Sequence, residues 1–228
     1  DQETFRKNLV YGRNKKDKSR LGLSAGVETT LVLDPEKGTA TMKALNPYVW
    51  PIEKWTDLQE AYGALRTGNL SPKVLGLGKS DKPFTWVSVD GTTKMSNMAL
   101  RYVMAQAEEK DLDRKPGMVQ QRDYGKAGEL MKQMLQNFHT LPINVYYTAQ
   151  ERVISVGGFD DDEDAEDQGV MQVPDLPAGV RSSILSIVEV IGRLYTIRTE
   201  EKGEEKVERR LQIGLHERYD TGYRSDYR

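Results

Sequence analysis

The sequence predicts an α/β fold: a mainly parallel sheet flanked by helices, with an antiparallel hairpin at the C-terminal end. Four short segments rich in apolar and β-branched residues alternate with helical segments, the order typical of a parallel sheet. The first of these strands leads into a pattern close to a phosphate-binding loop, and a helix follows it. Residues 192–215 have the pattern of two strands joined by a turn near Gly203.

The remaining elements follow from the spacing of apolar residues. The predicted strands are 8–12, 27–34, 84–91 and 143–150. The predicted helices are 18–25, 56–68, 92–110, 124–139 and a segment over 181–191 that runs into a strand. Thr56 is expected to cap the second helix and Gly68 to end it. We expect one domain over 1–228, with a core over about 7–191 and a hairpin and tail over 192–228.

Composition excludes several classes of protein. Lys and Arg number 33 and Asp and Glu 35, so the net charge of −2 does not fit a uniformly basic nucleic-acid coat, and polyanions would need local patches. The chain has no cysteine, which excludes disulfides and thiolate metal sites and fits a reducing compartment. No apolar run approaches the roughly 20 residues of a membrane span. We therefore expect a cytoplasmic protein without a membrane partner.

The segment "YGRNKKDKSRLGL" (11–23) matches the phosphate-loop pattern G-x-x-x-x-G-K-[ST] at Gly12, Lys18 and Ser19. In such a loop, backbone N–H groups and a helix N-terminus hold phosphate oxygens, the lysine adds positive charge, and the serine ligates Mg²⁺. ATP and Mg²⁺ are therefore the predicted ligands. The predicted nucleotide-binding residues are Gly12, Lys16, Asp17, Lys18, Ser19 and Arg20.

A second segment, "GLGKS" (76–80), contains Gly78-Lys79-Ser80 but lacks the context of a phosphate loop. The first glycine of the pattern would fall at position 73, which is lysine. The residues that follow, "DKPFTWV", predict a turn and a strand instead of a helix. This segment is therefore interpreted as an ordinary loop.

Asp17 stands where the phosphate-loop pattern has its second glycine. An aspartate there adds a Cβ and a negative charge beside a polyanion. Two like charges 4 Å apart repel by about 1 kcal/mol in water and about 4 kcal/mol at an effective dielectric of 20, enough to weaken ATP binding roughly tenfold to a thousandfold. Alternatively, Asp17 points away and pairs with a basic residue of the same segment, for which the candidates are Lys15, Lys16, Lys18 and Arg20.

Three further polar residues follow or end predicted strands. Asp90 closes "FTWVSVD" in the manner of a Walker-B aspartate, which orients Mg²⁺ together with Ser19. Glu36 follows the second strand, where a carboxylate can act as general base toward water. Gln150 ends "VYYTAQ", where an amide can sense the γ-phosphate. Together with the loop, these residues are expected at the carboxyl edge of the sheet, where α/β folds bind ligands.

The segments "LVYG…KS", "LVLDPEKG", "WVSVDG" and "VYYTAQER" come in an order that resembles RecA-like P-loop ATPases. Together with "RDYGKAGELMKQML" and "VIGRLYTI", they are most similar to phage-encoded nucleotide-binding proteins of the single-strand annealing (Sak) type. The resemblance spans about residues 7–215. It implies a RecA-like core, Glu36 and Gln150 in ATP hydrolysis, a ring or filament of identical subunits, single-stranded DNA as partner, a possible single-strand-binding protein partner, and the host cytoplasm as location.

The resemblance also implies DNA-binding loops after the third and fourth strands, at roughly 109–124 and 151–180. Candidate contacts near the first loop are Arg114, Lys115, Arg122, Tyr124 and Lys126. Seven of the eight residues over 160–167, in the second loop, are acidic, so this run would repel DNA or bind a basic partner. Candidate cations for the ATP site of a neighbouring subunit are Arg209, Arg210, Arg218 and Arg224.

The first functional hypothesis is an oligomeric ATPase of phage type that acts on single-stranded DNA in recombination or annealing. Because Asp17 occupies the second glycine position of the loop, the sequence does not decide whether the protein hydrolyses ATP. The alternative is a non-hydrolysing RecA-fold module that serves a protein partner. A small-molecule kinase is disfavoured, because no lid-like arginine cluster lies between the third and fourth strands.

Overall fold

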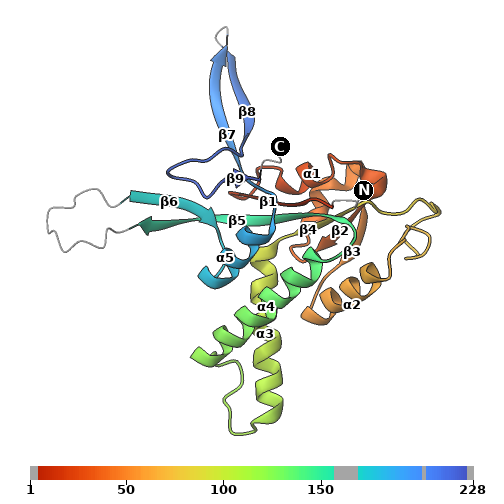
Figure 1. The fold of residues 1–228 in the computed structure, drawn as a ribbon, viewed down its shortest axis with the longest axis vertical. Coiled ribbons are helices and arrows are strands. Elements are labelled where there is room, and N and C mark those ends of the chain that lie inside the picture. Colours follow the sequence, from red (N-terminus) through yellow and green to blue (C-terminus); the bar gives the residue numbers. More distant parts are fainter. Residues whose placement is uncertain (1–4, 157–168, 202–203, 225–228) are drawn as a thin grey trace, which may run out of the picture.

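A mainly parallel sheet forms the centre of the molecule in the computed structural model, which describes residues 5–156, 169–201 and 204–224 (Figure 1). Its strands are β1 Lys7–Gly12, β2 Thr30–Asp34, β3 Tyr48–Pro51, β4 Trp86–Asp90, β5 Asn144–Val156, β6 Gly169–Pro174, β7 Val190–Glu201, β8 Glu204–Gln212 and β9 Gly222–Tyr223. Among the described residues, their order is β3-β2-β4-β5-β1-β7-β8. Neighbours from β3 to β7 are parallel, whereas β8 and β9 are antiparallel to β7 and β6 is antiparallel to β5.

Helical segments cover both faces of this sheet. They are α1 Lys18–Gly22, η1 Val27–Thr29, η2 Gly38–Leu45, α2 Trp55–Arg66, α3 Thr92–Lys110, α4 Gln121–His139 and α5 Ala178–Ile187. The helices α2 to α5 pack on one face and form the large core with it (Figure 1). The alternation of side chains along a strand separates the two faces: Leu9 and Tyr11 of β1 lie in the large core, whereas Val10 packs with Tyr146 and Leu21 on the α1 side.

The sequence of α4 shows why the helices form where they do. Gln120 and Asp123 make a capping box at its start. Along the helix, Met131, Met134 and Phe138 recur at helical spacing, and all three are buried against the sheet and its neighbouring helices. The predicted helix over 124–139 is therefore confirmed, with a start three residues earlier.

The predicted fold class is confirmed, and the differences concern strand limits. The predicted strand over 27–34 begins with the 3₁₀ turn η1, so only Thr30–Asp34 is extended. The strands β3, β6 and β9 were not predicted, because they are short and are defined by pairing with longer strands. The predicted hairpin over 192–215 is present as β7 and β8, while its turn at Gly203 lies outside the described residues.

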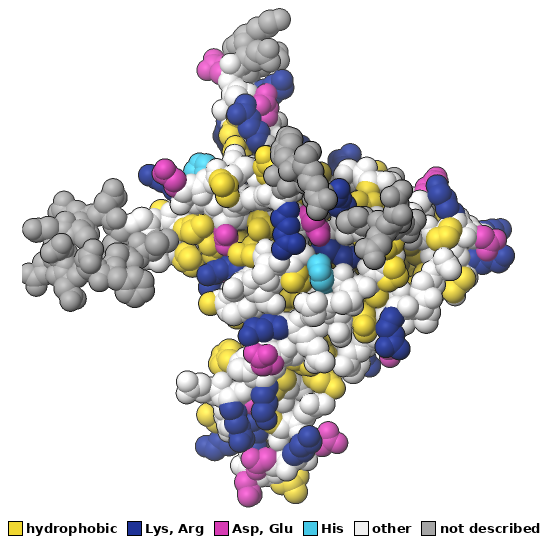
Figure 2. Space-filling view, in the orientation of Figure 1, with side chains coloured by type: hydrophobic (Ala, Val, Ile, Leu, Met, Phe, Trp, Pro, Cys, Tyr) yellow, Lys and Arg dark blue, Asp and Glu magenta, His cyan; other side chains and the backbone are white. Residues whose placement is uncertain are grey.

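The fourth predicted strand does not end at Gln150. It continues as β5 to Val156, because its second half changes partner and pairs with β6 from Glu151 onward. The predicted loop over 151–180 is therefore largely an antiparallel hairpin followed by α5, and its acidic run over 160–167 lies outside the described residues. Three projections leave the core: the β5–β6 hairpin, the β7–β8 hairpin and the α3–α4 pair (Figures 1 and 2).

Gly22 offers a test of how α1 is seated on the sheet. A Cβ at this position would lie 2.6 Å from Ser88 Oγ and 2.7 Å from Tyr146 Cδ1, so Gly22→Ala should destabilise the fold by about 1–3 kcal/mol. Gly63 lies in α2 with nothing within 4 Å of its added Cβ, so Gly63→Ala should stabilise by about 0.4–1 kcal/mol. Urea unfolding measures both effects, provided that the dependence of the unfolding free energy on urea concentration is the same in each variant. A Gly22→Ala protein as stable as Gly63→Ala would contradict this packing of α1.

Candidate nucleotide-binding site

The strands bring the predicted site residues to one edge of the sheet. Gly12 ends β1 directly opposite Gln150 of β5, and Asp90 ends β4 directly opposite Thr148 of the same strand. The ammonium group of Lys18, which follows the loop after β1, is close enough to Glu36 and Asp90 to influence the pKa of each. The residues expected from four separate segments therefore lie together at one edge of the sheet, which is called the pocket below.

The loop between β1 and α1 closes around Lys18. The Nζ atom of Lys18 donates to the carbonyl oxygens of Gly12 and Arg13, both at 2.9 Å. The Tyr146 hydroxyl donates to the carbonyl of Lys18 at 3.0 Å and so fixes the start of α1 on the sheet. Burial lowers the pKa of Lys18, and the carboxylates of Glu36 and Asp90 oppose this effect. An ammonium group has three N–H donors, which leaves one beyond the two loop carbonyls.

Asp17 points away from Lys18 and toward the C-terminal hairpin. Its carboxylate forms an ion pair with Arg209 Nη2 of β8 at 2.7 Å. The backbone of Asp17 has φ 65°, a left-handed conformation that aspartate adopts more readily than most residues. Of the two alternatives for Asp17, the structure therefore shows the one in which it points away, but its partner is Arg209 instead of a basic residue of the loop.

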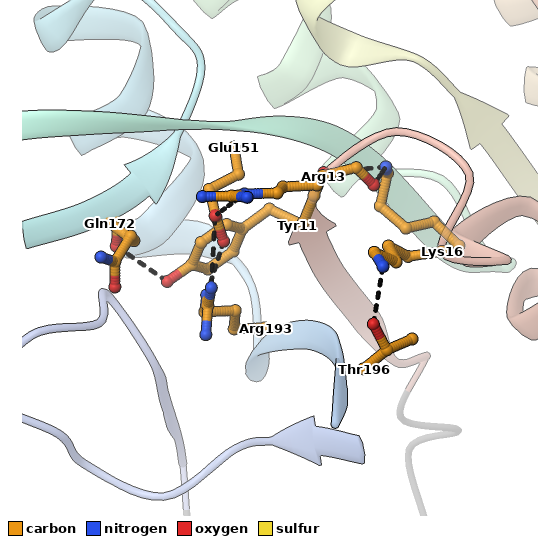
Figure 3. A network of polar contacts seen from close by, with 9 residues as sticks. Tyr11, Arg13, Lys16, Glu151, Gln172, Arg193 and Thr196 are labelled. Atoms are coloured by element: carbon orange, nitrogen blue, oxygen red, sulfur yellow. Dashed lines mark hydrogen bonds and ion pairs between the residues drawn. The ribbon is translucent and has the colours of Figure 1, made fainter. Parts of the chain in front are cut away.

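Two other residues predicted to bind nucleotide have different surroundings. Lys16 Nζ donates to Thr196 Oγ1 of β7 at 2.6 Å, so this side chain is engaged with the hairpin (Figure 3). Arg20 is exposed on α1, at the edge of a groove of about 670 Å³ between α1 and the hairpin. The apolar part of this groove is lined by Leu21, Leu23, Val27, Leu45, Leu194 and Leu211.

Asp90 has the features of a metal ligand. Only 3% of its surface is exposed, and its Oδ1 accepts a hydrogen bond from Thr148 Oγ1 at 2.8 Å. The buried Oδ2 has no well-formed hydrogen bond to any residue that the structure describes, although the Ser19 hydroxyl is close enough to lower the pKa of the carboxyl. Burial is the larger effect and raises the pKa of Asp90. A buried carboxylate oxygen beside a hydroxyl offers the hard oxygen ligands that Mg²⁺ requires.

This pair of ligands fits Mg²⁺ bound together with a nucleotide better than Mg²⁺ bound by protein alone. Within the described ranges, no group of three or more His, Cys, Asp or Glu side chains is placed to hold a metal. Mg²⁺ usually binds through one or two carboxylates and completes its octahedron with water and substrate phosphates. Ser19 and Asp90 match that arrangement.

Glu36 lies above the ends of β2 and β4. Gln150 Nε2 donates to Glu36 Oε1 at 3.3 Å. Burial raises the pKa of Glu36, the hydrogen bond from Gln150 lowers it, and the charge of Asp90 raises it. Gly91 makes room for this side chain, because a Cβ there would lie 2.4 Å from Glu36 Cγ and the backbone φ of +114° also favours glycine. A carboxylate with a raised pKa is suited to accept a proton near neutral pH.

Asp34 is a site residue that the sequence analysis missed. Its carboxylate accepts hydrogen bonds from the backbone N–H groups of Gly38 and Thr39, both at 3.0 Å, and from Thr39 Oγ1 at 2.6 Å. These bonds turn the chain after β2 and so place Glu36 over the pocket. A signal was available, since Asp34 closes an apolar strand in the same way as Asp90. Thr148 had no such signal, because only strand register brings it to Asp90.

A second polar network links the loop to β5 and β7. The carboxylate of Glu151, the residue after Gln150, pairs with Arg13 of the loop at 3.6 Å and accepts a hydrogen bond from Arg193 Nη2 of β7 at 3.2 Å (Figure 3). In the same view, the Tyr11 hydroxyl donates to the carbonyl of Gln172 in β6 at 3.0 Å. Side-chain contacts therefore connect the loop after β1 directly to the continuation of β5 and to the β7–β8 hairpin.

Of the predicted DNA contacts, Arg114 and Lys115 lie in the segment between α3 and α4, and the others lie in the first turns of α4. Arg114 has to be removed from them. Its side chain is buried and forms an ion pair with the buried Asp123, and its Nη2 also donates to the carbonyl of Met118. The other four candidates are exposed: Lys115, Arg122, Tyr124 and Lys126.

Three of the four cations expected to act on a neighbouring subunit have partners within the chain. Arg209 pairs with Asp17, and Arg210 pairs with Glu208 at 3.1 Å. Arg224 donates to the backbone carbonyl of Ser186. Arg218 is exposed beside the hairpin.

The sheet order and the loop that surrounds Lys18 define a P-loop NTPase fold. The comparison with known families agrees, because the model of a family described as an AAA domain matches residues 4–225. The chain therefore belongs to this family of P-loop ATPase domains, so the predicted P-loop class is confirmed, whereas the resemblance to the phage Sak type stays a prediction.

Comparison with individual proteins adds little. The flagellar accessory protein FlaH from Methanocaldococcus jannaschii, whose crystal structure is known, is similar over 90% of this chain and 77% of its own, with 11% identity and a TM-score of 0.37. No curated protein matches. In the part of the chain that the structure describes, no helix has the length and apolar character needed to span a bilayer.

The raised pKa of Asp90 predicts a pH-dependent effect on stability. A carboxyl whose pKa is higher in the folded than in the unfolded state stabilises the fold fully at low pH, and that stability is lost as the pH rises toward the raised value. Asp90→Asn should therefore be more stable than the parent protein in EDTA at pH 8, and the difference should shrink toward pH 4. Thermal unfolding across this pH range measures it.

Asp34→Asn is the matched control for Asp90→Asn. Asp34 is similarly buried, but both of its oxygens accept hydrogen bonds, so its substitution should lower stability by about 1–3 kcal/mol. Asp90→Asn that is no more stable than Asp34→Asn at pH 8 would contradict the view that the Asp90 charge is poorly compensated.

Proposed function

We propose that the protein binds Mg-ATP in this pocket and hydrolyses it. The observation that carries the proposal is the buried, unpartnered Oδ2 of Asp90, which lies beside Ser19 and within electrostatic reach of Lys18 and Glu36. A buried carboxylate oxygen that lacks a full set of hydrogen bonds is costly for the fold unless a bound cation compensates its charge.

In the bound state, Lys18 would place its third N–H donor on a phosphate oxygen while keeping its two bonds to loop carbonyls. Ser19 and Asp90 would hold Mg²⁺, which neutralises charge on the phosphates as the bond to the γ-phosphorus breaks. The groove beside α1 is large enough for a nucleoside, and its apolar lining suits the faces of a purine.

Hydrolysis requires that a water molecule lose a proton as it attacks. Glu36 is the carboxylate positioned to accept that proton, because Asp34 fixes its loop and Gly91 leaves space for it. Gln150 holds the Glu36 carboxylate through its amide, so a contact of Gln150 with the γ-phosphate would reach the base directly. That contact would also reach the hairpin network, since Glu151 is the next residue.

Glu36→Gln should lower ATP turnover at least about a hundredfold, because it removes the proton acceptor but keeps the side chain's shape. The Kd for Mg-ATP should change little, since Lys18, Ser19 and Asp90 stay in place. Steady-state turnover and equilibrium titration together measure the two quantities. Glu53→Gln is the matched control, because the Glu53 carboxylate is exposed and pairs with Lys37 at 3.1 Å.

A parent protein that binds Mg-ATP without turnover, with or without DNA, would instead support the non-hydrolysing module. That second candidate is favoured by one observation, the aspartate in the second glycine position of the loop. Lys18→Ala should abolish binding under either proposal. Binding that survives this change would place the nucleotide site elsewhere.

We further propose that the protein acts on single-stranded DNA, in recombination or annealing of the phage type. The support is the order of motifs along the chain and the exposure of three cations and an aromatic residue before and within the first turns of α4, namely Lys115, Arg122, Lys126 and Tyr124. Tyr124 is 62% exposed, and base stacking on an aromatic ring is tolerant of sequence. The same proposal includes an oligomer in which Arg218, an exposed cation, reaches the ATP site of a neighbouring subunit. It also includes a single-strand-binding protein as a partner.

Tyr124→Ala should weaken binding of a labelled single strand by about 1–3 kcal/mol at low salt, because one base loses its stacking platform. Replacing Lys115, Arg122 and Lys126 together should reduce the salt dependence of binding, because fewer counterions are released. Fluorescence anisotropy across a salt series measures both effects. Tyr223→Ala is the control, since Tyr223 is similarly exposed, at 56%, but lies on β9. No binding at micromolar protein would refute the DNA proposal and leave the ATPase proposal intact.

A further inference from the structure

Two consecutive side chains of the phosphate loop bind one facing pair of residues on the β7–β8 hairpin. Lys16 Nζ donates to Thr196 Oγ1 at 2.6 Å, and the Asp17 carboxylate pairs with Arg209 at 2.7 Å. Thr196 of β7 and Arg209 of β8 are directly opposite each other in the hairpin register. The loop is therefore fastened to both strands of the hairpin at the same level.

The hairpin also meets the loop through its backbone. The carbonyl oxygen of Leu194 would lie 2.3 Å from a Cβ at Gly12, so the first residue of the phosphate motif must be glycine for β7 to pass at this distance. Asp17, Leu194 and Arg209 all line the groove beside α1. The strands β7 and β8 thus line the groove beside α1 and also hold the loop through side-chain contacts.

Charge gives the Asp17 contact a specific role. Asp17 carries the negative charge in a loop otherwise rich in cations, at the position next to Lys18. A carboxylate free to turn toward bound phosphates would repel them, whereas one that is paired with a guanidinium is neutralised and held at a distance. The pair is partly exposed, with 39% of the Asp17 side chain and 58% of the Arg209 side chain accessible, so it contributes little to global stability.

We propose that Arg209 is a positioning residue for nucleotide binding: it holds the Asp17 carboxylate on the hairpin and so allows a phosphate loop with an acidic residue in its second glycine position to accept Mg-ATP. The inference rests on the proposed nucleotide site. It assigns to the C-terminal hairpin a part in ATP binding within its own subunit, which differs from the role in a neighbouring subunit expected for Arg209 from the sequence.

A double-mutant cycle on Asp17 and Arg209 tests this inference. Arg209→Ala should raise the Kd for Mg-ATP by about fivefold or more, because the released carboxylate faces the phosphates. Asp17→Gly alone should change the Kd little, because the parent carboxylate is already turned away. In the Arg209→Ala background, however, Asp17→Gly should restore the parent Kd. This non-additivity separates a charge held in place from a merely structural contact.

Isothermal titration with Mg-ATP of the full chain gives each Kd, and thermal unfolding confirms that each variant is folded. Arg209→Lys should preserve most of the affinity because it keeps the charge, and Arg209→Gln should behave like Arg209→Ala. Arg198→Ala is the matched control: Arg198 also lies on the hairpin and pairs with a carboxylate, that of Glu205 at 3.0 Å, but makes its pair away from the loop.

The outcomes distinguish this inference from the function on which it rests. A parent protein that does not bind Mg-ATP, or whose binding survives Lys18→Ala, rejects the nucleotide site and the inference with it. Lys18-dependent binding in which Arg209→Ala equals Arg198→Ala rejects the inference alone. A loss of affinity in Arg209→Ala that Asp17→Gly does not reverse also rejects it, because the effect would then not pass through the Asp17 charge.

Discussion

The parallel pairing of β5 with both β1 and β4 determines the geometry of the whole site. It sets Gln150 opposite Gly12 and Thr148 opposite Asp90. The start of the phosphate loop and the buried Asp90 therefore have fixed positions on the two sides of β5. Beyond Gln150 the same strand changes partner to β6, and Glu151 at that point connects the loop to β7. A slip of one residue in this register would move every side chain of the strand to the other face of the sheet.

The candidate site contains carboxylates whose burial disfavours their charged form. Burial raises the pKa of Asp90 and of Glu36. Both carboxylate oxygens of Asp34 accept hydrogen bonds from the turn after β2. The contrast separates two uses of carboxylates: Asp34 shapes the chain, and Asp90 and Glu36 remain available for a ligand. Family membership as a P-loop ATPase domain is consistent with this division.

Asp17 illustrates how a departure from a motif is accommodated. The position requires a left-handed backbone, which aspartate can adopt, and the added carboxylate has a partner on a strand almost two hundred residues later in the chain. The C-terminal hairpin, which in the sequence looks like a peripheral addition, thus lies against the loop and lines the groove beside it. The hairpin and the loop have to be considered as one unit.

The sequence by itself determined the class of fold and predicted the residues of the candidate site. The signals used are local: strand and helix periodicity, the glycine, lysine and serine of the loop, and the polar residues after apolar strands. They were sufficient to predict six site residues, namely Gly12, Lys18, Ser19, Glu36, Asp90 and Gln150. The structure brings all six to one sheet edge, because parallel strands present their carboxyl ends together.

Only the tertiary structure decided where the charged side chains turn. Arg114 looked like a surface cation but is buried against Asp123, and Asp17 was expected to face the phosphates or a basic residue of its own segment but pairs with Arg209. The continuation of β5 past Gln150 and the role of Thr148 were equally hidden. In each case the deciding partner lies on another element, and the pairing of distant segments, which no local periodicity encodes, determines which groups meet.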